Sequence, residues 1–226
     1  MKQTVLVMAL ACGCGRVGFD GKPELLDVYT ADGGSSGSVS VPVTLASGDL
    51  VIAAIATIGP ANPVMQMTDD IGNAYVSAGA RAVSPGSTVG CEIWYVNGSK
   101  PGTGTLTATA PVNYFSVWVA ELSGVAPGPP LAVFEASAIA PAITSSPQVT
   151  TTGADEVVFA LLGVDTFGAV PTGVDPSSPF AALDDLQLGA TAYYVAATDG
   201  DYAAAWDVPF MPGTCSSIVA FAANKQ

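Results

Sequence analysis

Because the 226 residues of this chain include no histidine, its acid–base chemistry would have to use carboxylates or an unusual base. That composition removes Ser-His-Asp and Cys-His nucleophile activation and every histidine-ligated metal site. Glu92 and Glu121 each lie in an apolar, strand-like stretch, where burial would raise a carboxyl pKa and suit an acid catalyst. Glycoside hydrolysis needs two such groups about 5–10 Å apart. The alternative is a buried carboxylate that hydrogen-bonds to backbone or tyrosine groups.

Paired aromatic residues could form a second kind of site, because flat rings stack on the apolar faces of sugars. Adjacent residues of a strand face opposite ways, however, so one ring of each pair must point inward. Core packing is therefore the alternative to glycan binding. The candidate ligand-binding residues are Trp94, Tyr95, Tyr193 and Tyr194.

Acidic residues in turn-like segments could supply oxygen ligands to a structural Ca²⁺ ion, which is the only cofactor we consider. None of these segments matches the twelve-residue EF-hand pattern, and aspartate next to glycine or asparagine is also an ordinary turn former. Calcium binding and plain turn formation both stay open. The weak Ca²⁺ candidates are Asp69, Asp70, Asp199 and Asp201.

Two cysteines, Cys91 and Cys215, lie beyond the first sixteen residues, and each begins a strand-like segment. In an exported chain an even pair predicts a disulfide, which stabilises by about 2–4 kcal/mol when unstrained. Two buried thiols that act as small apolar side chains are the alternative.

The first sixteen residues have the features of an export signal. Lys2 precedes a short apolar run that ends in small residues and cysteine, and this run is too short to span a bilayer. Ala11-Cys12-Gly13-Cys14-Gly15 resembles the lipobox of bacterial lipoproteins, although it lacks the usual leucine three positions before the cysteine. We prefer Cys14 to Cys12 as the lipidated residue, because the residues before Cys14 are all small.

The lipobox resemblance implies a cell-envelope lipoprotein whose acyl chains attach it to a membrane. The alternatives are an ordinary cleaved signal and a buried first strand. Gly15, rather than aspartate, follows the cysteine, which in that family favours the outer membrane. We therefore expect a signal peptide over residues 1–13, a flexible tether over 14–37 and a single β-sandwich domain over 38–226.

The charge balance limits the partners of this domain. Six basic and nineteen acidic residues give a net charge of −13, which repels phosphate backbones, so nucleic acid is not an expected partner. Charged residues make up only 11% of the chain, below the quarter usual for soluble domains. Such a surface is rich in Ser, Thr, Asn and Gly, as is common on secreted β proteins.

The elements that must position these side chains are β-strands. Between Thr105 and Thr109, threonines alternate with apolar residues. The segment that begins at Pro111 ends this run, and the following stretch from Tyr114 to Ala120 has apolar residues on both faces. The first pattern predicts a half-buried strand and the second a central strand covered on both faces. Helical periodicity is absent apart from a short stretch near Phe180. Turn signals separate roughly a dozen such strands, which predicts an all-β, antiparallel two-sheet sandwich.

Three strand-like segments recur in the same order in the second half of the chain. Asp155–Leu161 matches Asp49–Ile55, Ala192–Val195 matches Ile93–Val96, and Ile218–Ala222 matches Val117–Glu121. This order indicates an internal duplication, although any two sets of β-strands can look alike.

Residues 38–223 resemble the jelly-roll, concanavalin-like sandwiches of bacterial surface and phage-associated proteins in four short sequence segments. They are Gly48-Asp49-Leu50-Val51, Asp69-Asp70-Ile71-Gly72-Asn73, Ile93-Trp94-Tyr95-Val96 and Glu121-Leu122-Ser123-Gly124. The resemblance implies fold more than activity, since many such sandwiches bind glycans and some cleave them. The tight Glu-x-Asp-x-x-Glu spacing of the concanavalin-like hydrolases is missing here.

Our first hypothesis is a non-enzymatic surface lipoprotein for adhesion, glycan binding or envelope architecture, with glycans or other surface proteins as partners. One alternative is a carbohydrate-active enzyme that uses Glu92 or Glu121. Another is a purely structural domain of a surface assembly.

Overall fold

The regular structure of this chain is entirely β-strand. The computed structural model describes residues 21–33, 37–59, 65–84, 88–138, 143–165, 179–207 and 213–224. Within those ranges there is no helix, and every pair of neighbouring strands is antiparallel. The predicted all-β, antiparallel fold class is therefore confirmed.

The N-terminal half forms two sheets. The larger one, here the N-terminal inner sheet, has the order β1-β9-β3-β7-β5, with β6 also paired to β7; the N-terminal outer sheet has the order β2-β8-β4. The strands are β1 (Glu24–Gly33), β2 (Ser38–Leu45), β3 (Leu50–Ile58), β4 (Gln66–Asp69), β5 (Val76–Ser77), β6 (Ala82–Val83), β7 (Val89–Asn97), β8 (Gly102–Thr109) and β9 (Tyr114–Ser123).

The C-terminal half forms one large sheet and two small ones. The C-terminal inner sheet has the order β10-β18-β13-β15-β14, and the C-terminal outer pairs are β11·β17 and β12·β16. The strands are β10 (Ala132–Ala138), β11 (Ile143–Ser145), β12 (Val149–Thr151), β13 (Glu156–Val164), β14 (Ala181–Leu186), β15 (Gly189–Ala196), β16 (Gly200–Tyr202), β17 (Ala205–Asp207) and β18 (Thr214–Phe221). The stretch after Phe180 is thus strand β14, and the helical alternative there is wrong.

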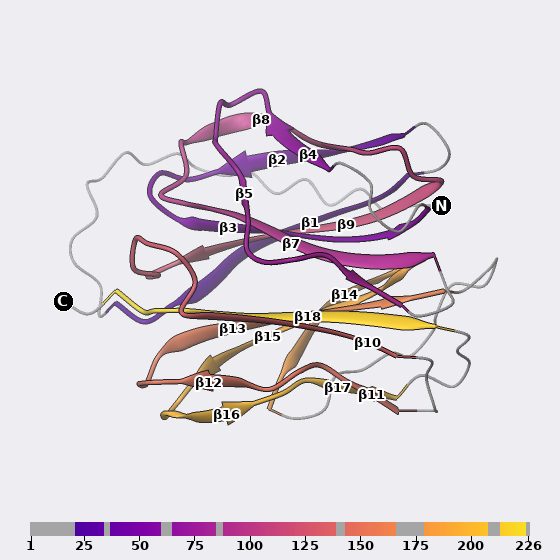
Figure 1. Ribbon diagram of the computed structural model, residues 1–226. Coiled ribbons are helices and arrows are strands. Elements are labelled where there is room, and N and C mark those ends of the chain that lie inside the picture. Colours follow the sequence, from indigo (N-terminus) through magenta and orange to yellow (C-terminus); the bar gives the residue numbers. More distant parts are fainter. Residues whose placement is uncertain are drawn as a thin grey trace, which may run out of the picture.

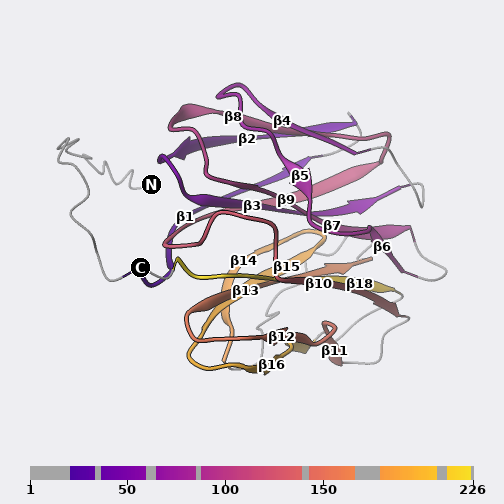
Figure 2. The ribbon, with the colours of Figure 1, turned by 60° about the vertical axis from the view of Figure 1, so that its left-hand side comes forward.

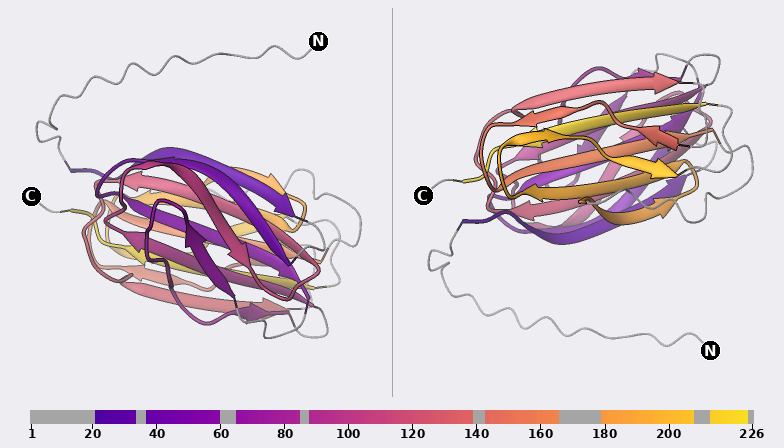
Figure 3. Two further views of the ribbon diagram at one scale, coloured as in Figure 1. Left: turned by 90° about the horizontal axis from the view of Figure 1, so that it is seen from above. Right: turned by 90° about the horizontal axis from the view of Figure 1, so that it is seen from below.

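The sheets stack as four layers, with the two inner sheets face to face and the smaller sheets outside them (Figures 1 and 2). Three apolar cores fill the spaces between the layers: a central core between the inner sheets and one outer core in each half. The prediction of two opposed sheets describes the centre of the molecule, and the outer sheets add a layer on each side. Views from above and below show the strands of the layers running across the molecule (Figure 3).

The continuously apolar strands occupy the inner sheets because those sheets are covered on both faces. Every residue of β13, and all but the last residue of β3, is buried. In β9, which lies between β1 and β3, only the first and last residues are not fully buried. The alternating residues of β2 are instead buried and exposed in turn, as the outermost layer requires. The central, two-face-covered strand predicted over Tyr114 to Ala120 is confirmed.

The tether predicted over residues 14–37 is wrong where it overlaps a strand. Glu24–Gly33 form β1, which pairs with β9 at the edge of the N-terminal inner sheet. Tyr29 and Ala31 pack on the N-terminal outer core, and Leu25 packs on the central core. Because this is an edge strand and none of its residues is fully buried, acidic residues interrupt its apolar ones, and its composition resembles that of a linker.

The two inner sheets share one strand order. If β1, β9, β3, β7 and β5 are matched with β10, β18, β13, β15 and β14, the orders coincide, as an internal duplication predicts. The strands matched by sequence thus occupy equivalent places. The first of those matches is one residue out of register, however, since Val51 faces the outer core and its counterpart Val157 faces the central core.

Candidate functional site

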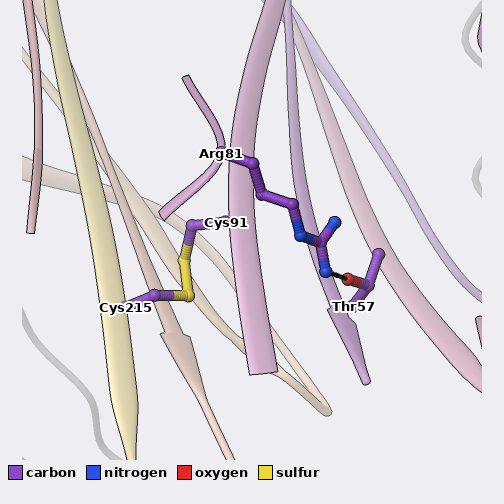
Figure 4. The surroundings of a disulfide bond; sticks show 4 residues. All are labelled: Thr57, Arg81, Cys91 and Cys215. Carbon is purple, nitrogen blue, oxygen red and sulfur yellow. Dashed lines mark hydrogen bonds between the residues drawn. A yellow bond between two sulfur atoms is a disulfide. The ribbon is translucent and has the colours of Figure 1, made fainter. Parts of the chain in front are cut away.

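The inner sheets are joined covalently at their interface. The Cys91–Cys215 disulfide links β7 to β18, with Cα atoms 5.7 Å apart, and both residues are at most 1% exposed (Figure 4). The predicted disulfide is therefore confirmed, and the alternative of two free buried thiols is wrong. Because its two ends lie in different halves and are 124 residues apart, the bond restricts the unfolded chain strongly.

A glycine makes room for this bond. A Cβ atom added to Gly163 of β13 would lie 2.6 Å from the Cys91 sulfur and 2.7 Å from the Cys215 sulfur. Any larger residue at this position would displace the disulfide or the strand. The sequence did contain a signal, since an isolated glycine inside a strand often marks close approach of another group, but we drew no prediction from it.

Polar contacts also cross the central interface at the β1–β14 side. The Ser116 hydroxyl donates to Asp32 within the N-terminal inner sheet and accepts the Leu188 amide at 3.1 Å. The Trp118 indole donates to the Asp184 carbonyl at 3.0 Å. These bonds satisfy polar groups inside an apolar interface and fix the two halves relative to each other.

A partly buried arginine lies on the opposite face of β7 from the disulfide (Figure 4). An Arg81 Nη2 hydrogen donates to the Thr57 hydroxyl, and a Cβ on Gly90 would overlap the guanidinium group. Burial lowers the pKa of Arg81, an effect that the negative charge of Glu92 opposes. The Nε and Nη1 atoms are buried and have no hydrogen-bond partner in the described part of the chain. They are out of reach of solvent, so this is not an open anion site.

The two candidate catalytic carboxylates lie apart. Glu92 pairs with Ile55 on one side of β3, and Glu121 pairs with Val51 on the other. Four residues along a strand and two strand spacings across put their Cα atoms roughly 16 Å apart. That exceeds the separation of about 5–10 Å used in glycoside hydrolysis, so the fold does not pair them.

Each of these carboxylates has a structural contact. Glu121 is 3% exposed and accepts the Ala46 amide at 2.6 Å, which holds the turn between β2 and β3. Glu92 accepts the Trp94 indole at 3.4 Å. Burial raises the pKa of Glu92, while the Trp94 hydrogen bond and the Arg81 charge oppose that rise.

The four candidate rings are distributed among three cores. Tyr95 and Tyr193 pack on the central core, Trp94 on the N-terminal outer core and Tyr194 on the C-terminal outer core. Tyr95 meets the Phe221 ring edge-on at 5.3 Å. All four are partly buried, and the fold does not bring them together on one surface.

Three of the four candidate calcium ligands accept hydrogen bonds from neighbouring protein groups. Asp69 accepts the backbone amides of Gly72 and Asn73 at 2.6 and 2.9 Å, which builds the turn after β4. Asp70 accepts the amide of Thr105, Asp201 accepts the hydroxyl of Thr150, and Asp199 is exposed. Among the described residues, no group of three or more acidic or cysteine side chains is placed to hold a metal ion.

The candidate lipidation residues Cys14 and Cys12 lie outside the described residues. Within the described ranges, no helix has the length and apolar character needed to cross a membrane. Comparison with protein-family models, curated proteins and solved structures found no match. The function must therefore be argued from the residues themselves.

Proposed function

We propose that this chain is an exported, non-enzymatic β-sandwich module for adhesion or envelope architecture, anchored by a lipid on Cys14. The observation that carries the proposal is the placement of the candidate chemical groups. Glu92, Glu121 and the four candidate rings pack against three separate apolar cores or their edges. Among the described residues, the fold neither brings Glu92 and Glu121 to catalytic distance nor gathers the four candidate rings on one surface. A module of this kind supplies shape and stability rather than chemistry.

The buried disulfide supports export. Such bonds form and persist in oxidising compartments and are rare in the reducing cytosol. Cys91 and Cys215 are fully enclosed between the inner sheets, so they pair as the halves come together during folding. An oxidising compartment is where this fold would form most readily.

The two ends of the described chain support attachment at one end of the sandwich. The Asn224 amide donates to the Gly124 carbonyl at 2.8 Å, and Lys22 packs directly against Gly124. A lipid tether at the N-terminus would therefore leave from the same end as the C-terminus. The rest of the sandwich would extend away from the membrane.

Anchoring is tested by metabolic labelling with a palmitate analogue. The wild type and Cys12→Ala should both incorporate label, whereas Cys14→Ala should not, because the acyl chains would be carried by Cys14. Unlabelled wild type would rule the anchor out. Label that is lost only in Cys12→Ala would move the anchor to that residue.

A glycan array tests whether the protein binds sugars, and a sugar-release assay tests whether it cleaves them. The wild type should neither bind nor release sugars. Binding that disappears in Trp94→Ala or Tyr193→Ala, with circular dichroism unchanged, would replace the proposal with a glycan-binding module. Sugar release that disappears in Glu121→Gln or Glu92→Gln, again with the fold intact, would make the protein an enzyme.

A further inference from the structure

The edges of the inner sheets are protected unequally. An exposed strand edge is a template for pairing with another chain, and proteins commonly shield it with charges, bulges or very short strands. β1 and β14 each have an irregular register, and they carry Asp27 and Asp184 at those irregularities. β5 and β6 have two residues each. Three of the four edges are thus protected in recognised ways.

The fourth edge, β10, has none of these protections. It is seven residues long, pairs in unbroken register with β18, and has no other strand partner in the described part of the chain. Phe134, the third residue of the strand, is 46% exposed, and Leu131, directly before the strand, is 45% exposed. Its one charged residue is Glu135, whose carboxylate accepts the Ala80 amide. Within the described ranges, β10 is therefore a long, mostly apolar edge strand without a bulge, and the Gly79–Ala80 segment contacts its Val133 and Glu135 side chains.

Charge separates this side of the molecule from the opposite one. β6 lies against β10, and β1 lies against β14, so the molecule has a β10 side and a β1–β14 side. The charged residues in β1 and β14 are all acidic: Glu24, Asp27, Asp32, Asp184 and Asp185. A cationic partner would be attracted there. A partner that itself carries a net charge of −13 would approach most easily on the β10 side, with the acidic sides far apart.

We propose that the occupant of the β10 edge is a second copy of this chain, which pairs antiparallel with β10 about a two-fold axis through Phe134. In this register Phe134 lies opposite its own copy, and Ala132 lies opposite Ala136. The small side chains leave room for the two rings on one face of the extended sheet. Glu135 lies opposite Val133, whereas an axis through Glu135 would place like charges directly opposite each other. The strand is thus self-complementary, as an isologous interface requires.

The register is tested by cysteine cross-linking of the full exported chain. Residues opposite each other in an antiparallel pair have Cα atoms about 4.5–5.5 Å apart, which is within disulfide range. Phe134→Cys should form a disulfide-linked dimer under mild oxidation. Ala136→Cys is the matched control and should stay monomeric on the non-reducing gel, because it faces Ala132. The native Cys91 and Cys215 are enclosed and cannot interfere.

The association itself is tested by sedimentation equilibrium. The wild type should dimerise, and Phe134→Lys should raise the dimer Kd at least about tenfold, which corresponds to about 1.4 kcal/mol. Leu26→Lys is the control, since Leu26 is 41% exposed but lies on β1; it should leave the Kd unchanged. Leu131→Lys, outside the strand, should weaken the dimer in the same direction if Phe134→Lys fails to fold.

Three outcomes would overturn the proposal. One is a wild type that stays monomeric at about 100 μM together with a Phe134→Cys variant that does not cross-link. Another is cross-linking of Ala136→Cys as efficiently as Phe134→Cys. The third is a dimer that Leu26→Lys abolishes and Phe134→Lys leaves intact, which would place the interface on the β1–β14 side.

Discussion

The two halves of the molecule have the same inner sheet and different outer covers. In the N-terminal half, β2 and β8 pair over eight residues each and β4 adds a third strand. In the C-terminal half, the cover consists of two separate pairs whose strands have three residues each. The inner strand order is nevertheless the same in both halves.

The difference shows which layer carries the fold. The inner sheets share the central core, the disulfide and the polar contacts of Ser116 and Trp118, so a change in either sheet affects both halves. Among the described residues, each outer core is built from its own half alone. The shorter C-terminal cover contributes Trp206, which is fully buried, where β2 contributes a row of valines. One large ring can bury apolar surface that a longer strand covers with several small side chains.

The largest expected effect comes from removing the bond that joins the halves. The Cys91→Ala/Cys215→Ala variant should lose about 4–5 kcal/mol of unfolding free energy, because the bond spans 124 residues and closes a long loop in the unfolded chain. Denaturant unfolding of this variant and the wild type measures the loss. A loss below about 1 kcal/mol would mean that packing alone joins the halves.

The glycine beside the disulfide distinguishes the halves at one position. Ala56 of β3 is the inward-facing counterpart of Gly163 in β13, and a Cβ on Gly163 would lie 3.5 Å from the Ala56 Cβ and nearer still to both sulfurs. Gly163→Ala should therefore cost about 1–3 kcal/mol through overpacking.

The control for Gly163→Ala is the same substitution in the Cys91→Ala/Cys215→Ala background, where both sulfurs are gone. Most of the cost should disappear there, and a double-mutant cycle measures the coupling. Equal costs in the two backgrounds would contradict the proposed clash with the disulfide.

The covers themselves are compared by native-state hydrogen exchange. Amides of β12 and β16 should exchange at least about tenfold faster than those of β2 and β8, because short strand pairs open locally at lower free energy. The matched controls are β3 and β13, which belong to the shared inner sheets and should exchange at similar rates. Equally slow exchange in both covers would mean that strand length does not set their local stability.

The smallest effect is the pH dependence that arises at Glu92 in the N-terminal half. Burial raises the pKa of Glu92 in the folded protein, against the opposing charge of Arg81. The folded state then holds its proton longer than the unfolded chain, so this carboxyl destabilises the protein as the pH rises. Glu92→Gln should be more stable than the wild type at pH 7, and the difference should shrink as the pH falls toward about 4. A difference that stays constant between those pH values would contradict this account.

Much of the inner architecture could be predicted from the sequence, because strands covered on both faces have a distinctive composition. The apolar runs after Asp49 and Asp155 became β3 and β13, and Tyr114 to Ala120 became the body of β9. The disulfide was predictable from an even pair of cysteines in a chain whose leader predicts export. Periodicity did not show how the residues of β3 and β13 correspond. A strand that is apolar on both faces has no alternation to show which residues face the central core.

The edges and the candidate sites were harder to predict for the same physical reason. β1 carries Asp27 and Asp32 because an edge strand faces solvent, so its sequence resembles a linker. Glu92 and Glu121 were identified as buried carboxylates, but only the pairing of β7 and β9 on opposite sides of β3 shows that they lie far apart. The local sequence predicts that a segment is a strand and which of its residues are buried. The order of strands in a sheet depends on contacts between residues far apart in the sequence.

The central structural claim is that the two halves fold against each other and are joined by the Cys91–Cys215 bond. Peptide mass mapping of the natively folded protein, digested without reduction, tests this directly. The account predicts a linked peptide pair that contains Cys91 and Cys215. Recovery of both residues as free thiols from natively folded protein would contradict it.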